Sequence, residues 1–258
     1  MAKMKPIVVS IPHASTYIPD DVRALLKQDE KALMHDPDLY TERIYNAACT
    51  NIVEAKFSRI ISDVNRAPDE IYTVGLKRSE GVVLLSLTDG SDVFKTDPPM
   101  ELMEEWVKRF HAPFHAELAE AMKNASFLID GHSMWSVGPR SKADSGVLRP
   151  DIVLGNRHYT TCDAETTQFF RHAYEKLGYT VAINTPYMGR YTVGVHCSRL
   201  GVPGIQIEVS RALYMNEETL APHEDAIERL HRQFQELVDE FSVWHAARPS
   251  SHICDLTS

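Results

Sequence analysis

The segment Phe127-Leu128-Ile129-Asp130-Gly131-His132 passes directly from an apolar run to side chains that can bind a metal or move a proton. Three other runs have the same form: residues 7–11 precede His13, residues 60–61 precede Asp63-Val64-Asn65-Arg66, and residues 202–207 precede Glu208-Val209-Ser210-Arg211. Short apolar runs rich in β-branched residues are typical of buried strands. Because ligands in open α/β sheets bind beyond the carboxyl ends of the strands, these four ends predict one shared hydrolytic site.

Strand-like and helix-like segments alternate along the chain on both sides of these runs. This alternation predicts an α/β fold with a mainly parallel sheet and helices on both faces. A length of 258 residues is sufficient for one large domain, which we expect over residues 1–248, with a flexible tail at 249–258. The expected strands are 6–11, 57–62, 127–129, 152–154, 180–183 and 204–209, the expected helices are 20–26, 38–55, 100–123, 164–177 and 222–244, and the long loops are 67–99, 133–149 and 185–200.

Two of the predicted helices carry clear local signals. Asp38 has the residue type of an N-cap for the helix at 38–55. In the helix at 100–123 the apolar residues recur at helical spacing, and Pro113 predicts a kink. The residues with this spacing are Leu102, Trp106, Phe110, Phe114 and Leu118.

Composition excludes several classes of function. A formal net charge of -9 without a stripe of Lys and Arg argues against a nucleic-acid partner. No apolar stretch is long enough to span a bilayer, and residues 1–5 lead into a strand-like segment without the apolar region of a signal peptide. The four cysteines form no CxxC pair, so we expect reduced thiols, a cytoplasmic protein and no membrane partner. A monomer and a small homo-oligomer both remain open.

Two histidines follow strand-like runs and are the candidate metal ligands. His13 alone is equally compatible with a structural role, but His132 in a second, similar position favours a metal site. Gly131 permits a tight turn and a close approach beside His132. Two imidazoles, one carboxylate and one open position describe a catalytic zinc site. We therefore expect one Zn²⁺ per chain.

The segment Asp63-Val64-Asn65-Arg66 is the most specific local pattern. Asp63 can accept the free N–H of a metal-bound imidazole. Asn65 and Arg66 can together bind a substrate carboxylate, because Arg offers two parallel donors and Asn adds a third. The alternative is a turn with a surface ion pair.

Glu208 is flanked by Ile207 and Val209, and an ionised carboxylate is costly to bury without a partner. A structural salt bridge with Arg211 is one explanation. The other, which we favour, is a general base whose pKa is raised by its apolar surroundings. His196 lies in the expected loop at 185–200 and is a candidate for the pocket lining.

Several motifs together resemble the N-formylglutamate amidohydrolase family. They are Ile11-Pro12-His13, Asp63-Val64-Asn65-Arg66-Ala67-Pro68, Asp130-Gly131-His132-Ser133-Met134, Pro150-Asp151-Ile152-Val153-Leu154-Gly155-Asn156 and Gln206-Ile207-Glu208-Val209-Ser210-Arg211. The resemblance covers most of the chain and extends to the site of zinc carboxypeptidases and the aspartoacylase group. It implies a phosphorylase/hydrolase-like, three-layer αβα sandwich with a mixed sheet. It also implies hydrolysis of N-formylglutamate to formate and glutamate, a late step of histidine degradation.

The resemblance also implies roles for single residues. His13 and His132 match the metal-binding histidines, and Glu208 matches the catalytic glutamate. Asp63, and Asp130 by its position, match residues that support the ligands from behind, and Asn65 with Arg66 matches the carboxylate clamp. Arg211 is expected either to orient Glu208 or to bind a second carboxylate.

Two departures from the related families leave questions open. The carboxypeptidase group takes a third ligand from a Glu three residues after its first His, where this chain has Thr16. Asp38 is our choice for that ligand, with Glu42 as the alternative, although Asp38 serves equally well as a plain N-cap. Arg190 stands where many relatives have glycine, so it is a candidate substrate contact that leaves the exact substrate open.

The resulting hypothesis is metal-dependent hydrolysis of an N-formyl or N-acyl acidic amino acid, with Glu208 as the base. The alternatives are another N-acyl amino acid deacylase or a carboxypeptidase on the same scaffold. A non-catalytic metal-binding or amino-acid-binding relative is the third possibility, supported by Thr16 at the position of the missing ligand.

Overall fold

The computed structural model describes residues 6–48, 50–71 and 78–248, and a six-stranded sheet runs through it. The order of the strands is β2-β1-β3-β6-β4-β5. The tail predicted at 249–258 lies outside the described residues. The strands are β1 Ile7–Ile11, β2 Thr50–Glu54, β3 Phe127–Met134, β4 Ile152–Gly155, β5 Val181–Ile183 and β6 Gly204–Ser210.

The direction of the strands brings several carboxyl ends to one edge. β1 pairs in parallel with β2 and β3, and β3 pairs in parallel with β6. β4 runs antiparallel to β6 and carries β5 in parallel beside it, which makes the sheet mixed. The predicted α/β fold with a mainly parallel, mixed sheet is therefore confirmed, and β1, β3 and β6 all end at the edge where we expected the site.

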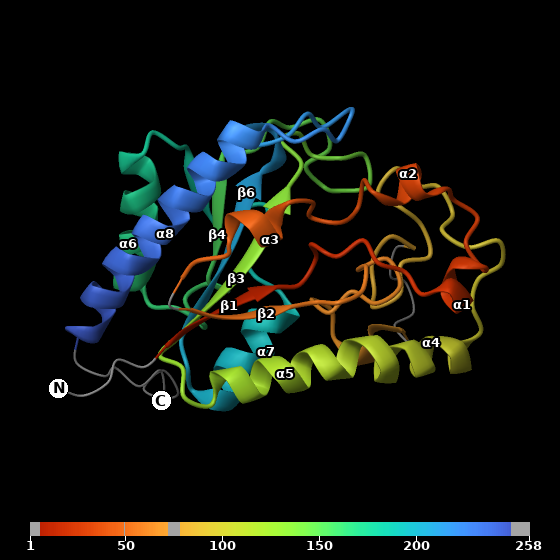
Figure 1. The fold of residues 1–258 in the computed structure, drawn as a ribbon, viewed down its shortest axis with the longest axis horizontal. Helices are drawn as coiled ribbons and strands as arrows, with labels where there is room; N and C mark the ends of the chain where they lie inside the picture. The colour runs from red at the N-terminus through yellow and green to blue at the C-terminus, as the bar shows by residue number, and fades with distance from the viewer. Residues whose placement is uncertain (1–5, 49, 72–77, 249–258) are drawn as a thin grey trace.

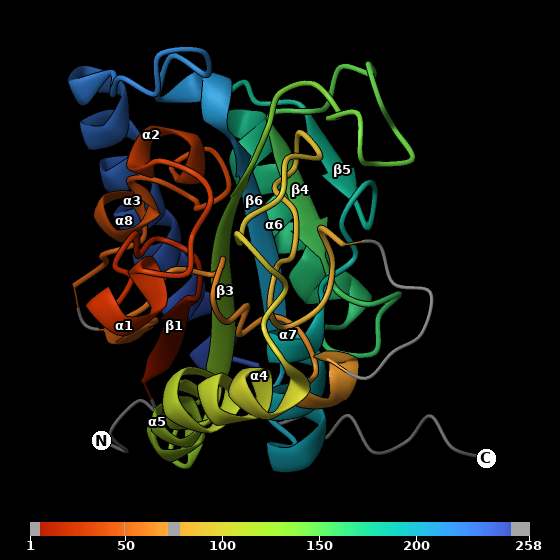
Figure 2. The same ribbon diagram turned by 90° about the vertical axis from the view of Figure 1, so that its right-hand side faces the viewer.

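Helices cover both faces of the sheet (Figures 1 and 2). On one face Ile7 and Val9 of β1 belong to a core with helices α3, α6 and α8, and on the other Val8 belongs to a core with α5 and α7. This alternation is what a strand buried on both faces requires. The helices are α3 Thr41–Ile44, α5 Ala112–Met122, α6 Ala164–Lys176, α7 Tyr191–Leu200 and α8 Glu224–Ala246.

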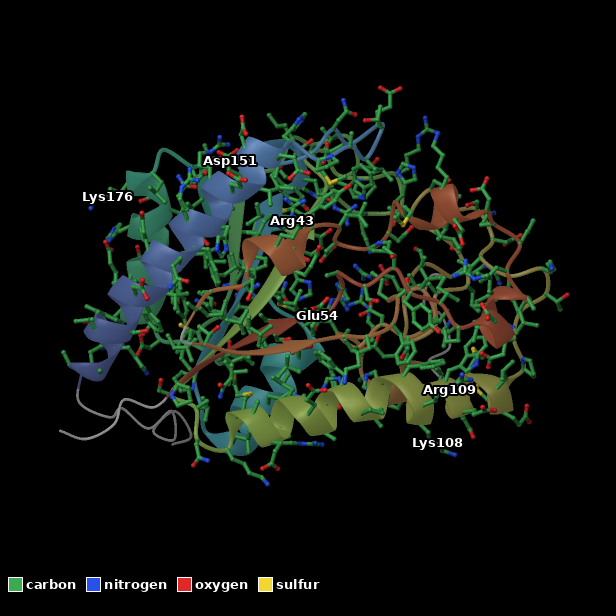
Figure 3. All side chains as sticks on the ribbon, in the orientation of Figure 1. Arg43, Glu54, Lys108, Arg109, Asp151 and Lys176 are labelled. Atoms are coloured by element: carbon green, nitrogen blue, oxygen red, sulfur yellow. The ribbon has the colours of Figure 1, made fainter. Side chains whose placement is uncertain are left out.

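A third apolar cluster lies outside the sheet, under the loop-rich part of the chain. Ile60 and Ile61 are buried there against Trp106 of α4 (Met100–Trp106). Two short helices, α1 (Asp20–Arg23) and α2 (Glu30–Leu33), belong to the same region, to the right in Figure 1. Charged side chains such as Lys108 and Arg109 extend from the outer side of the helical layers (Figure 3).

The helix predicted at 38–55 is wrong. Only α3 is helical, and residues 50–54 form the edge strand β2. The helix ends at Tyr45, whose buried hydroxyl shares its proton between the carbonyl oxygens of His132 and Ile207. Beyond it, Ile52 and Val53 are β-branched and pair with β1, so tertiary pairing overrides the helical pattern.

The strand predicted at 57–62 is also wrong. The segment makes a turn, in which the N–H groups of Ile61 and Ser62 donate to the carbonyl oxygen of Ser58. Only Ile60 and Ile61 are contiguous and apolar, and both pack into the third cluster instead of joining the sheet. The segment Asp63-Val64-Asn65-Arg66 therefore reaches the site on a loop.

The long loop predicted at 185–200 contains a helix, α7. Its buried residues Val193, His196 and Cys197 share one face, and Gly201 ends it with a left-handed φ of 63°. Gly194 concealed this pattern in the sequence. In the predicted helix at 100–123, α4 and α5 are joined by a π-helical turn, Val107–His111, just before Pro113, which lacks the N–H that a regular helix needs.

Two simpler predictions concern thiols and membranes. Cys162 and Cys197 are free and buried, whereas Cys49 and Cys254 lie outside the described residues. Within the described parts of the chain no helix is long and apolar enough to cross a membrane.

Candidate metal centre and active site

Three strand ends carry the central residues of the site. His13 follows β1, His132 lies in β3, and Glu208 lies in β6 directly beside His132 in the strand register. All three line one pocket, together with Asp38 and Arg66. The parallel directions of β1, β3 and β6 explain this convergence, because each strand delivers its side chain to the same edge.

His13, Asp38 and His132 form a buried group in which the potential ligand atoms all lie within 4.8 Å of one another. Oδ2 of Asp38 lies 3.5 Å from Nδ1 of His13 and 3.3 Å from Nδ1 of His132. Tetrahedral zinc with bonds of about 2.0–2.1 Å separates its ligand atoms by roughly 3.3 Å. The group thus has the donors and the spacing of a zinc site, and Glu42 is not a member of it.

Each histidine is supported from behind by a buried aspartate. Nε2 of His13 lies 2.7 Å from Oδ1 of Asp63, and Nε2 of His132 lies 3.0 Å from Oδ2 of Asp130. When Nε2 donates to a carboxylate, Nδ1 is left with a free lone pair that faces the centre. Nδ1 of His13 is buried and has no hydrogen-bond partner among the described residues, which is the condition expected of a metal ligand.

Asp38 is held in the centre by a residue of β3 and by the residue that follows β6. Its Oδ2 accepts from the backbone N–H of Ser133 at 3.1 Å, and its Oδ1 accepts from Nη2 of Arg211 at 2.9 Å. Burial opposes ionisation of Asp38, but the hydrogen bonds with His13 and His132 and the charge of Arg211 hold its pKa well below the usual range. Asp38 is therefore an anionic ligand candidate.

Arg211 is bound mainly by backbone carbonyl groups. Its guanidinium is 2% exposed and donates to the carbonyl oxygens of His35, Asp36 and Pro37 as well as to Asp38. These bonds hold the loop at 35–38, and Arg211 also lines the pocket that contains Glu208. The sequence could not reveal this, because backbone carbonyl groups leave no residue signature.

Glu208 has the surroundings of a general base. Burial raises its pKa to about 7, a change that the charge of His132 partly opposes. Its Oε1 accepts from Nε2 of Gln206 at 2.8 Å, which leaves Oε2 available to take a proton. A carboxylate with a pKa near neutrality can both accept and return a proton at physiological pH.

The Asp63 carboxylate separates two arginines of different character. Arg59 donates to its Oδ2 at 2.6 Å, and although burial opposes it, the charge of Asp63 raises the pKa of Arg59. Arg66 is farther away, with Nε 3.9 Å from Oδ2, and this buried Nε has no hydrogen-bond partner among the described residues. Arg66 is thus a buried cation in the pocket with donors still to satisfy.

Asn65 connects the pocket to α7. Its Oδ1 accepts from the backbone N–H of Thr192 at 2.9 Å, and its Nδ2 donates to Oε1 of Gln206 at 3.3 Å. The same Oε1 accepts from the backbone N–H of Arg190 at 3.2 Å. Asn65 and Gln206 together fix the start of α7 against the site and bring Arg190 to the pocket lining.

Comparison with known proteins agrees with this geometry. The chain matches the sequence model of the N-formylglutamate amidohydrolase family over residues 5–215. The chain belongs to this family. It is 26% identical over 261 residues to the N-formylglutamate deformylase of Pseudomonas putida, with 94% of each chain covered. It is 27% identical over 263 residues to that of Pseudomonas aeruginosa, covering 94% of this chain and 95% of the relative.

Solved structures of the N-formylglutamate amidohydrolase family share the fold. The N-formylglutamate amidohydrolase of Ralstonia eutropha JMP134 aligns with a TM-score of 0.81 and 22% identity over 95% of both chains. A protein from Agrobacterium tumefaciens aligns with a TM-score of 0.69 and 18% identity over 92% of both chains. The family matches and these alignments agree with the predicted amide hydrolase on an α/β scaffold.

Three histidines of this N-formylglutamate amidohydrolase family member lie behind the Asp63–Arg66 loop. Nε2 of His111 donates to the carbonyl oxygen of Arg66 at 2.9 Å, and Nε2 of His115 donates to that of Val64 at 2.8 Å. His196 contacts Nδ1 of His115 through its own Nε2 at 2.9 Å and is not among the pocket-lining residues, so the structure does not bring it to the substrate side. The spacing of His111 and His115, four residues apart on a helix, was the available signal for this support.

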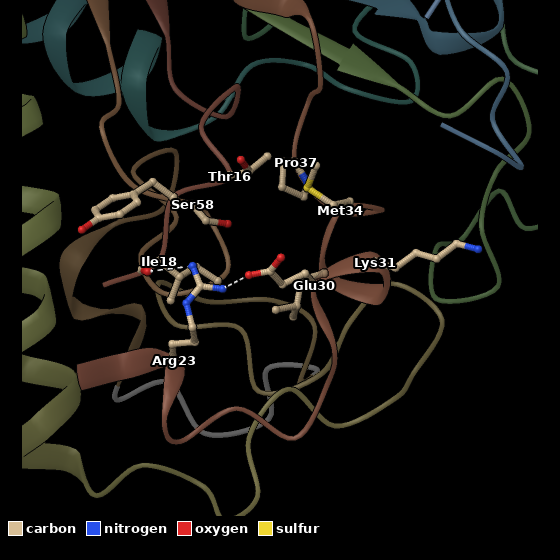
Figure 4. Close-up of a pocket in the computed structure, with 10 residues that line it drawn as sticks. Thr16, Ile18, Arg23, Glu30, Lys31, Met34, Pro37 and Ser58 are labelled. Atoms are coloured by element: carbon tan, nitrogen blue, oxygen red, sulfur yellow. Dashed lines mark hydrogen bonds and ion pairs between the residues drawn. The ribbon is translucent and has the colours of Figure 1, made fainter. Parts of the chain in front are cut away.

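A second hollow, of about 470 Å³, lies beside α1 and α2 and is lined by Thr16, Ile18 and Arg23 among others (Figure 4). Arg23 is engaged there with Glu30 and with the carbonyl oxygen of Ile18. The hollow holds no His among its lining residues, so its chemistry is unlike that of the metal centre. Thr16 lines this hollow and is not among the residues that line the pocket of the candidate metal centre.

Proposed function

We propose that the protein hydrolyses N-formyl-L-glutamate to formate and L-glutamate in a zinc-dependent reaction. The observation that carries this proposal is the convergence of His13, Asp38 and His132 beside Glu208 and Arg66 in one pocket. The membership of the chain in the N-formylglutamate amidohydrolase family supports the choice of substrate. Histidine degradation in the cytoplasm is the setting that this reaction would have.

His13, Asp38 and His132 would hold the zinc ion, with Asp63 and Asp130 fixing the orientation of the two rings. Zinc in such a site supplies a Lewis acid that lowers the pKa of water and polarises an amide carbonyl. Asp38 would bring a negative charge into direct contact with the ion, which favours a divalent cation.

Glu208 moves the proton. Its Oε2 takes a proton from the attacking water, and the same oxygen returns it to the nitrogen of the leaving glutamate. Gln206 holds Oε1 throughout and keeps the carboxyl group facing the pocket. The pKa of about 7 supports both halves of this role, because neither the charged nor the neutral form is strongly favoured.

Arg66 binds the substrate carboxylate next to the reacting amide. It is buried beside Asp63, which also contacts His13, so a carboxylate on Arg66 lies close to the ligands. In N-formylglutamate the α-carboxylate is on the carbon that carries the amide nitrogen, which suits this short separation. Asn65 lines the same side, and Arg190 lines the pocket with its exposed side chain.

Other amide substrates on the same machinery are the main alternative, and a panel of substrates tests the choice. We expect purified protein to release formate from N-formyl-L-glutamate with a higher kcat/KM than it shows for N-acetyl-L-glutamate or a peptide ending in glutamate. Faster cleavage of the acetyl compound or the peptide would replace our proposal with a deacylase or a carboxypeptidase. Binding of these compounds without cleavage of any of them would favour the non-catalytic relative, against which the raised pKa of the buried Glu208 argues.

A further inference from the structure

Lys142 is a pocket cation that belongs to none of the motifs found in the sequence. It lies in the segment between β3 and β4 and lines the same pocket as Arg66, Arg190 and Glu208. Its Nζ lies 3.3 Å from Oε1 of Glu80, and the two side chains are 24% and 22% exposed. Lys142 is thus held in a defined place part-way between the buried centre and solvent.

The backbone that carries Lys142 is fixed by several bonds. Arg149 binds Asp144 through two hydrogen bonds of 2.7 and 3.0 Å. The N–H of Arg149 donates to the carbonyl oxygen of Ser136, and the N–H of Lys142 donates to that of Pro139. A cation on such a braced segment loses little conformational freedom when it binds a ligand.

Two other cations in the pocket, Arg59 and Arg211, already have hydrogen-bonded acidic partners. Arg59 is engaged by Asp63, and Arg211 by Asp38 and three carbonyl groups. The Lys142 ammonium has three N–H donors, and its contact with Glu80, the one hydrogen bond it makes within the described part of the chain, leaves two of them. Arg66 is 8% exposed on its side chain and lies deeper than Lys142, so the two offer separate positions along the pocket.

We propose that Lys142, oriented by Glu80, binds the distal carboxylate of the substrate and thereby selects a dicarboxylate over its neutral amide. The inference rests on the proposed function. The γ-carboxylate of a glutamate derivative is two methylene groups beyond the carbon that bears the amide nitrogen. With the α-carboxylate on the deeper Arg66, the γ-carboxylate extends toward the outer part of the pocket, where Lys142 offers its donors.

The electrostatics of Glu80 agree with this arrangement. Burial opposes its ionisation, but Lys142 first, and Arg66 and Arg190 after it, lower its pKa. The pKa of Lys142 is lowered, mainly by burial. The charge of Glu80 raises this pKa, and the charge of Arg66 lowers it further. The charge of Arg66 therefore acts on both Lys142 and Glu80, and that of Arg190 acts on Glu80 and Arg66.

The test compares N-formyl-L-glutamate with N-formyl-L-glutamine, which has the same shape and lacks the distal charge. In Lys142→Gln we expect the ratio of kcat/KM for the two substrates to fall about tenfold, mainly through KM for the charged substrate, as for the loss of one charge-assisted contact. Lys142→Arg keeps the charge and should restore the ratio to within about threefold of the wild type. Glu80→Gln keeps an acceptor for Lys142 but removes the negative charge, so the ratio should rise.

Lys27→Gln is the matched control, because Lys27 makes a 3.0 Å ion pair with Asp92 on the exposed surface. An equal fall for both substrates in Lys142→Gln, or a ratio equal to that of Lys27→Gln, would overturn the inference. Calorimetric titration with L-glutamate and L-glutamine separates it from the proposed function. If the wild type releases no formate but binds L-glutamate in preference to L-glutamine, and Lys142→Gln loses this preference, the proposed function is refuted. Lys142 then remains the carboxylate-binding residue.

Discussion

Nε2 of His13 lies 2.7 Å from Oδ1 of the fully buried Asp63. This contact couples the metal centre to the loop that carries Arg66, because the other oxygen of Asp63 faces Arg59 and Arg66. One carboxylate thus fixes the orientation of His13, a candidate metal ligand, and balances the charge beside Arg66, the arginine proposed to bind the substrate. The centre and the binding side of the pocket are parts of one hydrogen-bonded unit.

Asp63→Asn should weaken zinc binding by about 10- to 100-fold. A neutral amide at this position accepts a weaker hydrogen bond from Nε2 of His13 than a carboxylate does, so the imidazole becomes a less basic ligand. Competition for zinc with a chromophoric chelator measures the change. Asp97→Asn, which alters an exposed pair with Arg78, is the control and should bind zinc like the wild type. Equal zinc affinity in Asp63→Asn and Asp97→Asn would show that the contact between Asp63 and His13 has no part in metal binding.

Glu208→Gln should retain zinc and lose about 10²- to 10⁴-fold in kcat, because the amide cannot take the proton that the reaction releases. Gln206 can still hold the new side chain, so the pocket keeps its shape. Formate release gives the rate, and elemental analysis of the same sample gives the zinc content. Turnover near that of the wild type, with zinc present, would remove Glu208 from the role of base.

Arg211→Met should lower the free energy of unfolding by about 3–5 kcal/mol, because it leaves the buried charge of Asp38 and three carbonyl groups without their donor. Urea unfolding in the presence of a chelator measures this apart from metal binding. Arg43→Met removes an exposed pair with Glu224 and should leave the midpoint nearly unchanged. A midpoint for Arg211→Met like that of Arg43→Met would mean that the loop at 35–38 is held by other contacts.

The histidines behind the Asp63–Arg66 loop should make the fold sensitive to acid. Burial lowers the pKa of His115 to about 3 and that of His196 to about 4, whereas an unfolded histidine titrates near 6.5. The contribution of these neutral histidines to the free energy of unfolding is therefore fully present above pH ~6.5. It is lost as the pH falls toward 4, because the unfolded chain takes up protons at a higher pH than the folded chain does. Each group can change the free energy of unfolding by at most about 1.4 kcal/mol per pH unit.

Urea unfolding between pH 7 and 5, with chelator present, tests this dependence. His115→Gln should show a smaller loss of stability over that range than the wild type, since one of the buried groups no longer titrates. His172→Gln changes an exposed histidine of α6 and should follow the wild type. A pH slope in His115→Gln as steep as in His172→Gln would assign the acid sensitivity to other groups.

The sheet was predictable where strands are continuous and buried on both faces. β1 is mostly apolar, the first three residues of β3 are apolar, and Ile and Val recur at every second position of β6, so these strands are visible in the local sequence. They position His13, His132 and Glu208. The register that sets His132 beside Glu208 follows from the parallel pairing of β3 and β6. Because the carboxyl ends of parallel strands meet at one edge of the sheet, the central residues of the site could be predicted from the sequence.

The remaining parts depend on partners distant in the chain. Ile60 and Ile61 pack against α4 and residues 83–84, so a short apolar run forms a buried turn there instead of a strand. Arg211 is defined by backbone carbonyl groups about 175 residues earlier, and Lys142 by Glu80 across 62 residues. Local sequence carries no trace of such contacts, and polar residues in a loop, such as Lys142, look the same whether they line a pocket or face solvent.

Metal removal and restoration test the central claim most directly. Purified protein is stripped with a chelator and titrated with zinc while formate release from N-formyl-L-glutamate is followed, with His132→Ala as the parallel variant. We predict that activity is lost on stripping, returns to its full value at about one zinc per chain in the wild type, and does not return in the variant. Formate release that persists in fully stripped protein would contradict the account.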